Sequence, residues 1–392
     1  MGKAIGGNAV IERRIATAQG LSSGDGHALA GFVDAEGCFQ IRPNNRGRTW
    51  SCRMSLALRL DDADVLTDLC RVTGLGRISM KSAQGTSQPQ ACWNVGSKRE
   101  CAELTRILRT FPLRARKRHD FEIWARAVDR WVANPYDTNA TRALHTEMAH
   151  DAAALRHVRR YVKSPPPALD GPAEDLLAYL GGFCSGEACF SLSRLQPRAV
   201  VKLRRDYRGI LELFAERFGL GTVRDRGPYG TGNPLVTWVV CATGEMGEAV
   251  RLFEAAQLRG RKRREFEVWR EAAEERAFAR LAGRRWDRTR VQYVAGRLTA
   301  LREYLPPVHP PGPAGTEVTA RDARLAYVDV LRTFAAEVPD RKLSCTTYEQ
   351  VRAGHPEWPT RNTLARAFGT WGEALAAAGL GSRASGWRRE RR

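Results

Sequence analysis

A nine-residue motif that occurs twice constrains the fold of this chain more than any other feature. Residues 29–37 read Leu-Ala-Gly-Phe-Val-Asp-Ala-Glu-Gly, and residues 180–188 read Leu-Gly-Gly-Phe-Cys-Ser-Gly-Glu-Ala. Each copy has small residues near its centre and an acid near its end, Glu36 or Glu187, just before a strand-like run. We expect each copy to form a helix that ends at its glutamate.

Both motif copies lie within a longer internal repeat. At an offset of 145 residues, Gly-Leu-Gly at 74–76 matches 219–221, and the motifs are 151 apart, so the first hairpin of the second half is six residues shorter. Two homologous halves predict an internal pseudo-two-fold axis with a site where the halves meet. Further matched pairs are Trp93 and Trp238, Leu113 and Leu258, Lys117 and Lys262, Phe121 and Phe266, and Trp124 and Trp269.

The pattern of each half predicts an αββαββα unit of the α+β class with an antiparallel sheet. In the first half we expect helices at 27–35, 61–73, 98–109 and from 117 towards 161, and strands at 38–43, 49–60, 77–81 and 91–95. In the second half we expect strands at 188–194, 198–204, 222–225 and 236–241, and helices at 207–218, 245–256 and 262–277.

Glycine-rich and proline-rich stretches divide the chain into segments. Lys-Ser-Pro-Pro-Pro at 163–167 indicates a stiff linker between the halves. We expect a flexible N-terminal segment 1–26, a first repeat 27–162, a linker 163–174, a second repeat 175–305, a Pro-rich linker 306–316, a small all-α module 317–380 and a basic tail 381–392.

The charge of the chain indicates a polyanionic partner. Lys and Arg number 63 against 43 Asp and Glu, a formal charge of +20. Nucleic acid is the commonest such partner. An anionic membrane is the alternative, but the sequence has no strongly basic amphipathic helix and no long apolar run. The nine Cys form no CxxC pair, so we expect small buried residues in a reducing compartment, no zinc site and a cytoplasmic protein.

The two motif glutamates are costly where we expect them. Each lies at a helix C-terminus, where the helix dipole disfavours negative charge by about 0.3–1 kcal/mol. Ala30-Gly31 and Gly181-Gly182 allow the two helices to approach closely, and the carboxylates then repel each other. A divalent cation with oxygen ligands, such as Mg²⁺, relieves that repulsion and supports phosphodiester hydrolysis. The alternative is that each glutamate is a solvated acid at a helix end.

The motifs and the surrounding units resemble the single-chain, two-repeat LAGLIDADG homing endonucleases, over about residues 27–275. The resemblance implies two pseudo-symmetric units with saddle-like antiparallel sheets in one monomer. It also implies that Glu36 and Glu187, with Ala35 and Gly186 before them, hold the catalytic Mg²⁺, a site that Mn²⁺ or Ca²⁺ also fits. The second copy departs from the family pattern, because Ser185 replaces the acid found at Asp34 and Ala188 replaces the final glycine.

A dense basic block precedes the last predicted helices of each half. Residues 111–121 align with 256–266, and both contain Arg-Lys-Arg. Basic residues at a helix start oppose the dipole preference, so phosphate contact explains them better than helix stability. By resemblance, Lys117 and Lys262 are the catalytic lysines, with Arg116 and Arg261 as adjacent alternatives and DNA contacts. The alternative is a phosphate-contacting patch without a catalytic part.

Antiparallel strands in a major groove present alternate side chains to base edges. Because the halves differ at almost every such position, a long asymmetric site on double-stranded DNA is expected rather than a palindrome. The candidates in the first half are Gln40, Arg42, Asn44, Arg46, Arg48, Arg77 and Lys81. In the second half they are Ser191, Ser193, Arg194, Gln196, Arg198, Lys202, Arg204, Arg224 and Arg226.

The C-terminal module contains an amphipathic segment at 320–337 and a second helical pattern after Thr360, with Leu364, Phe368, Trp371 and Leu375 at helical spacing. Its Phe-Gly-Thr-Trp ending resembles the helical repeat attached to homing endonucleases. That resemblance implies an auxiliary DNA-binding unit with Arg361, Asn362 and Arg366 on its exposed face. The alternative is a module for stability or dimerisation.

The sequence thus predicts a monomeric, Mg²⁺-dependent, site-specific DNA endonuclease that associates with the nucleoid when bound to DNA. One alternative is a DNA-binding regulator of the same fold without catalysis, although both motif acids are present. Another is a maturase that binds intron RNA and assists splicing.

Overall fold

The computed structural model of the protein describes residues 20–44, 49–83, 88–134, 141–158, 171–227, 233–303, 320–355 and 358–381, with the side chains at 141–142, 320–326, 362 and 366 excepted. Most of the predicted N-terminal segment, both predicted linkers except 171–174, and the tail from 382 lie outside these residues. The chain divides into two compact units, residues 1–310 and 311–392, which are described separately.

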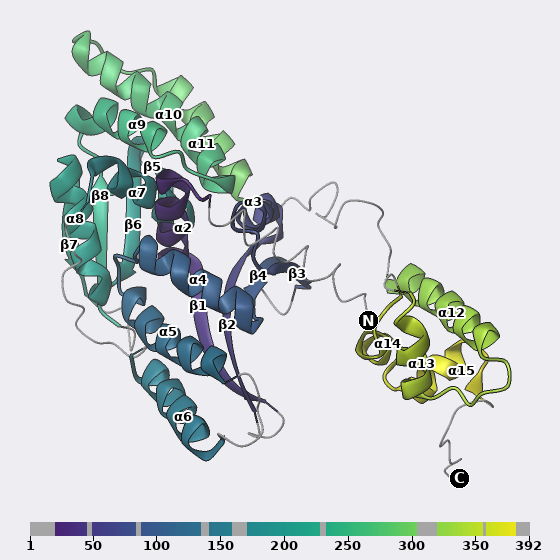
Figure 1. The fold of residues 1–392 in the computed structure, drawn as a ribbon. Coiled ribbons are helices and arrows are strands. Elements are labelled where there is room, and N and C mark those ends of the chain that lie inside the picture. The colour runs from purple at the N-terminus through teal and green to yellow at the C-terminus, as the bar shows by residue number, and fades with distance from the viewer. Residues whose placement is uncertain are drawn as a thin grey trace. The chain divides into compact units, whose positions relative to one another are not determined.

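The first unit contains both repeats, and each repeat has the predicted order followed by additional helices (Figure 1). The first repeat comprises α2 (Ser23–Glu36), β1 (Gly37–Asn44), β2 (Thr49–Arg59), η2 (Leu60–Asp62), α3 (Ala63–Thr73), β3 (Arg77–Lys81), β4 (Gln90–Val95), α4 (Lys98–Thr110), α5 (Lys117–Ala133) and α6 (Thr141–Val158).

The second repeat has the same succession of elements. It comprises α7 (Ala173–Glu187), β5 (Ala188–Ser193), β6 (Gln196–Arg204), η3 (Arg205–Tyr207), α8 (Arg208–Phe218), β7 (Thr222–Arg226), β8 (Leu235–Val240), η4 (Thr243–Glu245), α9 (Met246–Ala255), α10 (Gly260–Leu281) and α11 (Arg288–Arg302). The two four-stranded antiparallel sheets have the orders β1-β2-β4-β3 and β5-β6-β8-β7. The predicted α+β class with two related units is confirmed.

Helices α2 and α11 differ from the sequence prediction. Helix α2 begins at Ser23 rather than His27, because the Ser22 hydroxyl caps it by accepting a hydrogen bond from the Asp25 amide. Helix α11 was not predicted, although it corresponds to α6 of the first repeat. Its signal is faint, since only Val291, Val294 and Leu298 are buried in it.

The repeated Gly-Leu-Gly and Trp residues form the same structure in both halves. Gly74 and Gly219 end α3 and α8 with φ of 66° and 62°, the left-handed region that glycine occupies without strain. The Trp93 indole N–H donates to the Leu75 carbonyl at 2.8 Å, and that of Trp238 donates to the Leu220 carbonyl at 2.8 Å. The shared spacing between Gly-Leu-Gly and Trp therefore reflects the same helix-to-strand connection in both repeats.

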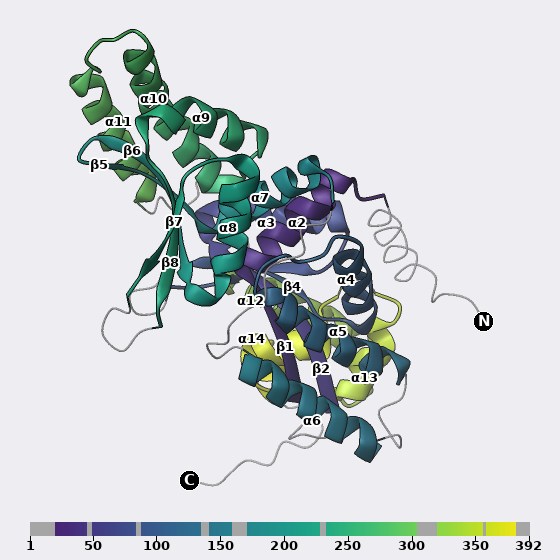
Figure 2. The ribbon, with the colours of Figure 1, turned by 90° about the vertical axis from the view of Figure 1, so that its left-hand side faces the viewer.

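Helices α2 and α7 lie side by side between the two sheets (Figures 1 and 2). A Cβ atom on Gly31 would lie 2.1 Å from the Tyr179 carbonyl oxygen, and one on Gly182 would lie 1.9 Å from that of Ala28. The predicted close approach of the motif helices is confirmed. Gly181 serves another contact, since its Cβ would meet the Ala256 carbonyl oxygen at 1.8 Å.

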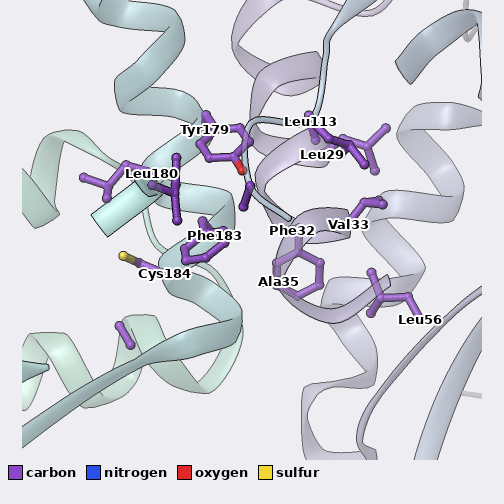
Figure 3. Close-up of a cluster of buried hydrophobic side chains, with 14 of the residues drawn as sticks. Leu29, Phe32, Val33, Ala35, Leu56, Leu113, Tyr179, Leu180, Phe183 and Cys184 are labelled. Atoms are coloured by element: carbon purple, nitrogen blue, oxygen red, sulfur yellow. The ribbon is translucent and has the colours of Figure 1, made fainter. Parts of the chain in front are cut away.

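Apolar side chains of both repeats form one core around this helix pair. Figure 3 shows Phe32 of α2 near Phe183 of α7, while Leu29 lies near Leu113 and Leu180 lies on the far side of α7. Trp124 is fully buried, and so is its counterpart Trp269. Both tryptophans therefore pack in the core. No helix among the described residues is long and apolar enough to cross a bilayer.

The second unit is a small helical bundle of α12 (Ala320–Glu337), α13 (Cys345–Arg352), α14 (Arg361–Phe368) and α15 (Trp371–Ala377). It has its own core, in which Phe334, Tyr348 and Leu375 are fully buried. Thr360 caps α14 by accepting a hydrogen bond from the Thr363 amide. The helical spacing from Leu364 to Leu375 spans two helices rather than one, because Gly369 (φ 100°) ends α14.

Candidate nucleic-acid interface and active site

The strand register of the first sheet places polar side chains on one face. Residues directly opposite each other in neighbouring strands share a face. Gln40 pairs with Arg53, Arg42 with Ser51, and Lys81 with Gln90. A row across all four strands consists of Cys38, Ser55, Asn94 and Arg77.

This face therefore includes the predicted Gln40, Arg42, Arg77 and Lys81, while Phe39 and Ile41 point to the core. Sequence reasoning missed Arg53, Ser55 and Asn94. Their signal was present, because each alternates with buried residues in strands that were themselves predicted. Asn44 is exposed at the end of β1, whereas the predicted Arg46 and Arg48 lie outside the described residues.

The second sheet has an equivalent polar face with different residues. Ser191 pairs with Arg198, and Ser193 with Gln196. Lys202 pairs with Thr237, which pairs with Arg224, and Arg204 shares its face with Arg226 through Leu235. Arg194 was predicted on the strand but lies in the two-residue turn after it, with φ of 53°.

Three of the arginines that were predicted to contact DNA form ion pairs within the protein. These pairs do not support a DNA-contacting role. Arg116 is 7% exposed; it donates to Asp120 at 3.0 Å and lies 3.5 Å from Asp206. Arg261 pairs with Glu265 of its own helix and lies 3.6 Å from Asp62. Arg204 pairs through two nitrogens with Asp206. These arginines therefore join the repeats or fix the strand ends, a role that the sequence pattern did not distinguish from phosphate binding.

The motif glutamates meet at the ends of the central helices. Glu36 is the last residue of α2 and Glu187 the last of α7. A Cβ atom on Gly186 would lie 2.7 Å from the Ala35 Cβ and 3.2 Å from Oε1 of Glu36. The absence of a side chain at Gly186 thus lets the first glutamate come against the second helix. Neither glutamate is fully exposed.

The two predicted lysines lie at this same place. Nζ of Lys117 donates to the carbonyl oxygen of Ala35, the residue before Glu36. Nζ of Lys262 lies 3.7 Å from Oε2 of the buried Glu265. The charges of both lysines act on both motif glutamates. The structure therefore favours the lysines over the neighbouring arginines as the basic groups of the site.

Burial governs the protonation of this cluster. It raises the pKa of the Glu36 carboxyl, against the charges of Lys117 and Lys262. Burial and then the charge of Glu36 raise the pKa of Glu187 to about 7, again against the two lysines. Burial lowers the pKa of the Lys117 ammonium, while Asp34 and then Glu36 oppose that shift. Two desolvated acids that repel each other are the setting in which a bound cation is most favourable.

The donor set fits a hard divalent cation. Carboxylate and carbonyl oxygens suit Mg²⁺, Mn²⁺ and Ca²⁺. Glu36 and Glu187 supply the carboxylates. Ala35 and Gly186 precede them in the last turn of each helix, where backbone carbonyls have no donor within the helix. Within the described part of the chain, no group of three or more His, Cys, Asp or Glu side chains is placed to hold a metal ion. A cation here therefore needs further oxygen ligands, from backbone, water or phosphate.

Asp34, at the sixth motif position, is fully buried and holds the segment that leads to Lys117. Its carboxylate accepts hydrogen bonds from the amides of Arg114 at 2.8 Å, Ala115 at 2.6 Å and Lys117 at 3.2 Å. It also accepts one from the Tyr179 hydroxyl of the other motif helix at 2.7 Å. This position is therefore structural, and it links both repeats to one lysine.

Glu187 also opens onto the polar face of the second sheet. A cavity of about 380 Å³ is lined by Glu187, Lys202, Arg204 and Tyr207, among others. Carboxylate, basic side chains and sheet face thus share one surface.

The second unit gives less support to a nucleic-acid interface. Arg361 is exposed, and its amide donates to Glu349 at 2.9 Å. The side chains of Asn362 and Arg366 lie outside the description. Residues 320–381 contain eight Lys and Arg against seven Asp and Glu, so the strong positive charge of the chain resides elsewhere. The DNA-binding role of this unit stays a prediction.

Comparisons with known proteins agree with this geometry. Residues 29–128 match the family model described as LAGLIDADG endonuclease. No curated protein sequence is similar enough to this chain to count as a relative.

Solved structures share the fold. One is the LAGLIDADG homing endonuclease I-GzeII in complex with its DNA target, with 17% identity and a TM-score of 0.55 over 71% of this chain and 99% of that one. Another is I-SmaMI bound to uncleaved DNA in the presence of calcium ions, with 16% identity and a TM-score of 0.53 over 71% and 97%. A third is I-SmaMI bound to cleaved DNA, with 17% identity and a TM-score of 0.52 over 71% and 95%.

Proposed function

We propose that this chain, which has the two-repeat LAGLIDADG fold and matches the LAGLIDADG endonuclease model in its first repeat, is a site-specific endonuclease that cuts double-stranded DNA with a divalent cation. The observation that carries the proposal is the pairing of Glu36 with Glu187 at the ends of two tightly packed helices. Lys117 and Lys262 act on both carboxyls, and the polar sheet faces lie beside them.

Each glutamate has a defined part in the proposed reaction. Glu36 and Glu187 would hold the cation with their carboxylate oxygens, next to the backbone of Ala35 and Gly186. When bound, a divalent cation polarises the phosphate and makes water a better nucleophile at neutral pH. Mg²⁺ is the proposed physiological ion.

The lysines would provide the remaining positive charge at the scissile phosphates. Lys117 is half-buried and donates a hydrogen bond to the Ala35 carbonyl, so its ammonium is held in position. A fixed charge stabilises the negative charge that develops on the phosphate without the cost of reorienting water. Lys262 would serve the other half of the site.

The two sheet faces would read the DNA. Each combines basic residues for phosphates with amide and hydroxyl groups for base edges. Gln40 and Arg42 of the first sheet are replaced by Ser191 and Ser193 in the second, although Arg53 is matched by Arg198. Because most of the polar positions differ, the proposed target is long and asymmetric. The internal pseudo-two-fold axis allows a monomer to cut both strands.

A cleavage selection on a library of genomic DNA fragments tests this function. Wild type is incubated with Mg²⁺ or with EDTA, beside Glu36→Gln and Glu187→Gln. The matched control is Glu216→Gln, which changes an exposed acid on α8. We expect discrete Mg²⁺-dependent ends with wild type and the control, and none with the motif variants.

Other outcomes point to other functions. If specific DNA fragments are bound but never cut, the protein is a DNA-binding regulator of the same fold rather than a nuclease. Tight binding of intron RNA that survives both motif substitutions would favour a maturase. The absence of any cleavage or retention would refute the proposal.

A further inference from the structure

In the two repeats, different acids accept hydrogen bonds from the backbone segments that contain Lys117 and Lys262. In the first repeat, Asp34 of the motif accepts three amide hydrogen bonds from residues 114–117. In the second repeat the motif residue is Ser185, whose hydroxyl accepts from the Arg259 amide at 2.8 Å and donates to the Gly181 carbonyl. In the second repeat a hydroxyl therefore stands where the first repeat has a carboxylate. It accepts one amide hydrogen bond from the equivalent segment 259–262, whereas Asp34 accepts three.

The missing acid is supplied by the other repeat. Asp62, at the end of η2 in the first repeat, accepts a hydrogen bond from the Arg261 amide at 2.5 Å. The same carboxylate lies 3.6 Å from the Arg261 guanidinium and 3.3 Å from that of Arg264. Asp62 is 8% exposed, so it is placed to support the protein rather than to contact solvent or DNA.

Two further positions change together with this exchange. Gly260 has φ of +59°, and a Cβ atom on it would lie 2.9 Å from Oδ1 of Asp62 and 2.6 Å from Cγ2 of Val65. Its counterpart in the first repeat is Ala115, whose amide faces Asp34 instead. The counterpart of Asp62 in the second repeat is Tyr207. Position 260 is therefore glycine, where the backbone approaches Asp62 closely. The equivalent position 115 is alanine, where Asp34 of the motif accepts the amide hydrogen bond.

We propose that Asp62 is a positioning residue that holds Lys262 across the repeat interface, as Asp34 holds Lys117 within its own repeat. The inference rests on the proposed nuclease function. Lys262 follows the anchored Arg261 directly and lies in the first turn of α10. A movement of that amide therefore moves the start of the helix and the lysine with it. A misplacement of about 1 Å at a catalytic group costs a rate factor of about 100.

The resulting prediction concerns one DNA strand rather than both. Lys262→Met first identifies the strand whose cleavage depends on Lys262, on a target labelled separately in each strand. Asp62→Ala should slow cleavage of that same strand at least tenfold and leave the other within about threefold. Asp62→Asn keeps an acceptor for the Arg261 amide and should fall between Asp62→Ala and wild type. Asp34→Ser should slow the opposite strand.

A rescue variant separates positioning from loss of folding. Ser185→Asp restores an acid to the second motif, where its carboxylate can reach the 259–260 amides. Added to Asp62→Ala, it should recover at least threefold of the lost rate on the Lys262 strand. Equal slowing of both strands by Asp62→Ala, or slowing of the Lys117 strand, would overturn the inference. So would the absence of any rescue in a double variant whose urea unfolding matches that of wild type.

An assay without DNA keeps this inference distinct from the nuclease proposal. In the full-length protein, Asp62→Ala should increase amide hydrogen exchange in peptides that cover 259–262 and leave those covering 114–117 unchanged. Asp34→Ser should do the reverse. If wild type cuts no DNA but exchange follows this pattern, the nuclease proposal fails while the cross-repeat support stands. If Asp62→Ala changes both segments equally, the positioning role fails whatever the activity.

Discussion

Substitution of Gly31 by alanine tests the central helix pair most sharply. The added Cβ would lie 2.1 Å from the Tyr179 carbonyl oxygen and 2.9 Å from the Phe183 nitrogen. Ordinary contact begins at 3.4 Å, so the two helices must separate by more than 1 Å at this point. Both atoms belong to the α7 backbone, so no side-chain rotation relieves the clash.

The magnitude follows from two opposing effects. Glycine to alanine in a helix contributes about 1 kcal/mol in favour of the folded state. Forced separation of a packed interface costs about 1–3 kcal/mol in overpacking, and a gap of about 1 Å forfeits up to half of the dispersion energy of the atoms along it. Because Phe32 and Phe183 pack at this interface, we expect a net loss of about 2 kcal/mol. The movement should also pull Glu36 away from Glu187.

Equilibrium unfolding in urea measures this loss, with Gly24→Ala as the matched control. Gly24 lies in the same helix, and a Cβ atom there meets nothing within 4 Å. The control should therefore be as stable as wild type or more stable, while Gly31→Ala and Gly182→Ala unfold at lower urea. If Gly31→Ala proves as stable as Gly24→Ala, the close packing of the motif helices is wrong.

Three other predictions follow from the same geometry. In EDTA, the unfolding free energy of wild type should fall relative to that of Glu187→Gln as pH rises from 4.5 to about 7. Burial raises the pKa of Glu187 from 4.5 to about 7, so the folded state binds that proton more tightly than the unfolded state does. Parallel plots of unfolding free energy against pH for the two proteins would contradict this. Trp93→Phe and Trp238→Phe should each cost about 2 kcal/mol in urea unfolding, because each leaves a buried carbonyl without its donor; a large effect at one site alone would argue against equivalent repeats. Lys117→Met should lower single-turnover cleavage about 100-fold with little change in DNA affinity by gel shift; an equal loss of affinity would make it a binding residue.

Much of the fold could be predicted from the sequence because local patterns and the repeat agreed. The strand at 77–81 and the helix at 320–337 coincide with the observed elements. The repeated Trp and Gly-Leu-Gly recur because the same hydrogen bond and helix end are built twice. Helix α11 escaped prediction because few of its residues are buried, so its periodicity is weak.

The candidate site was predictable in its acids and lysines but not in its supporting contacts. Glu36 and Glu187 stand at repeat-equivalent positions, which a single sequence reveals. Arg116 and Asp62 act through partners that are distant in the sequence, such as Asp206 and Arg261. A basic residue that pairs with a buried acid looks the same in sequence as one that faces DNA, so only the structure separates them.

The most direct test of the central claim is strand-resolved, single-turnover cleavage of the selected target in Mg²⁺. Wild type should cut both strands, and Glu36→Gln and Glu187→Gln should each abolish double-strand breaks while specific binding persists. Double-strand cleavage that continues at the wild-type rate in either variant would contradict a composite active site built from these two glutamates.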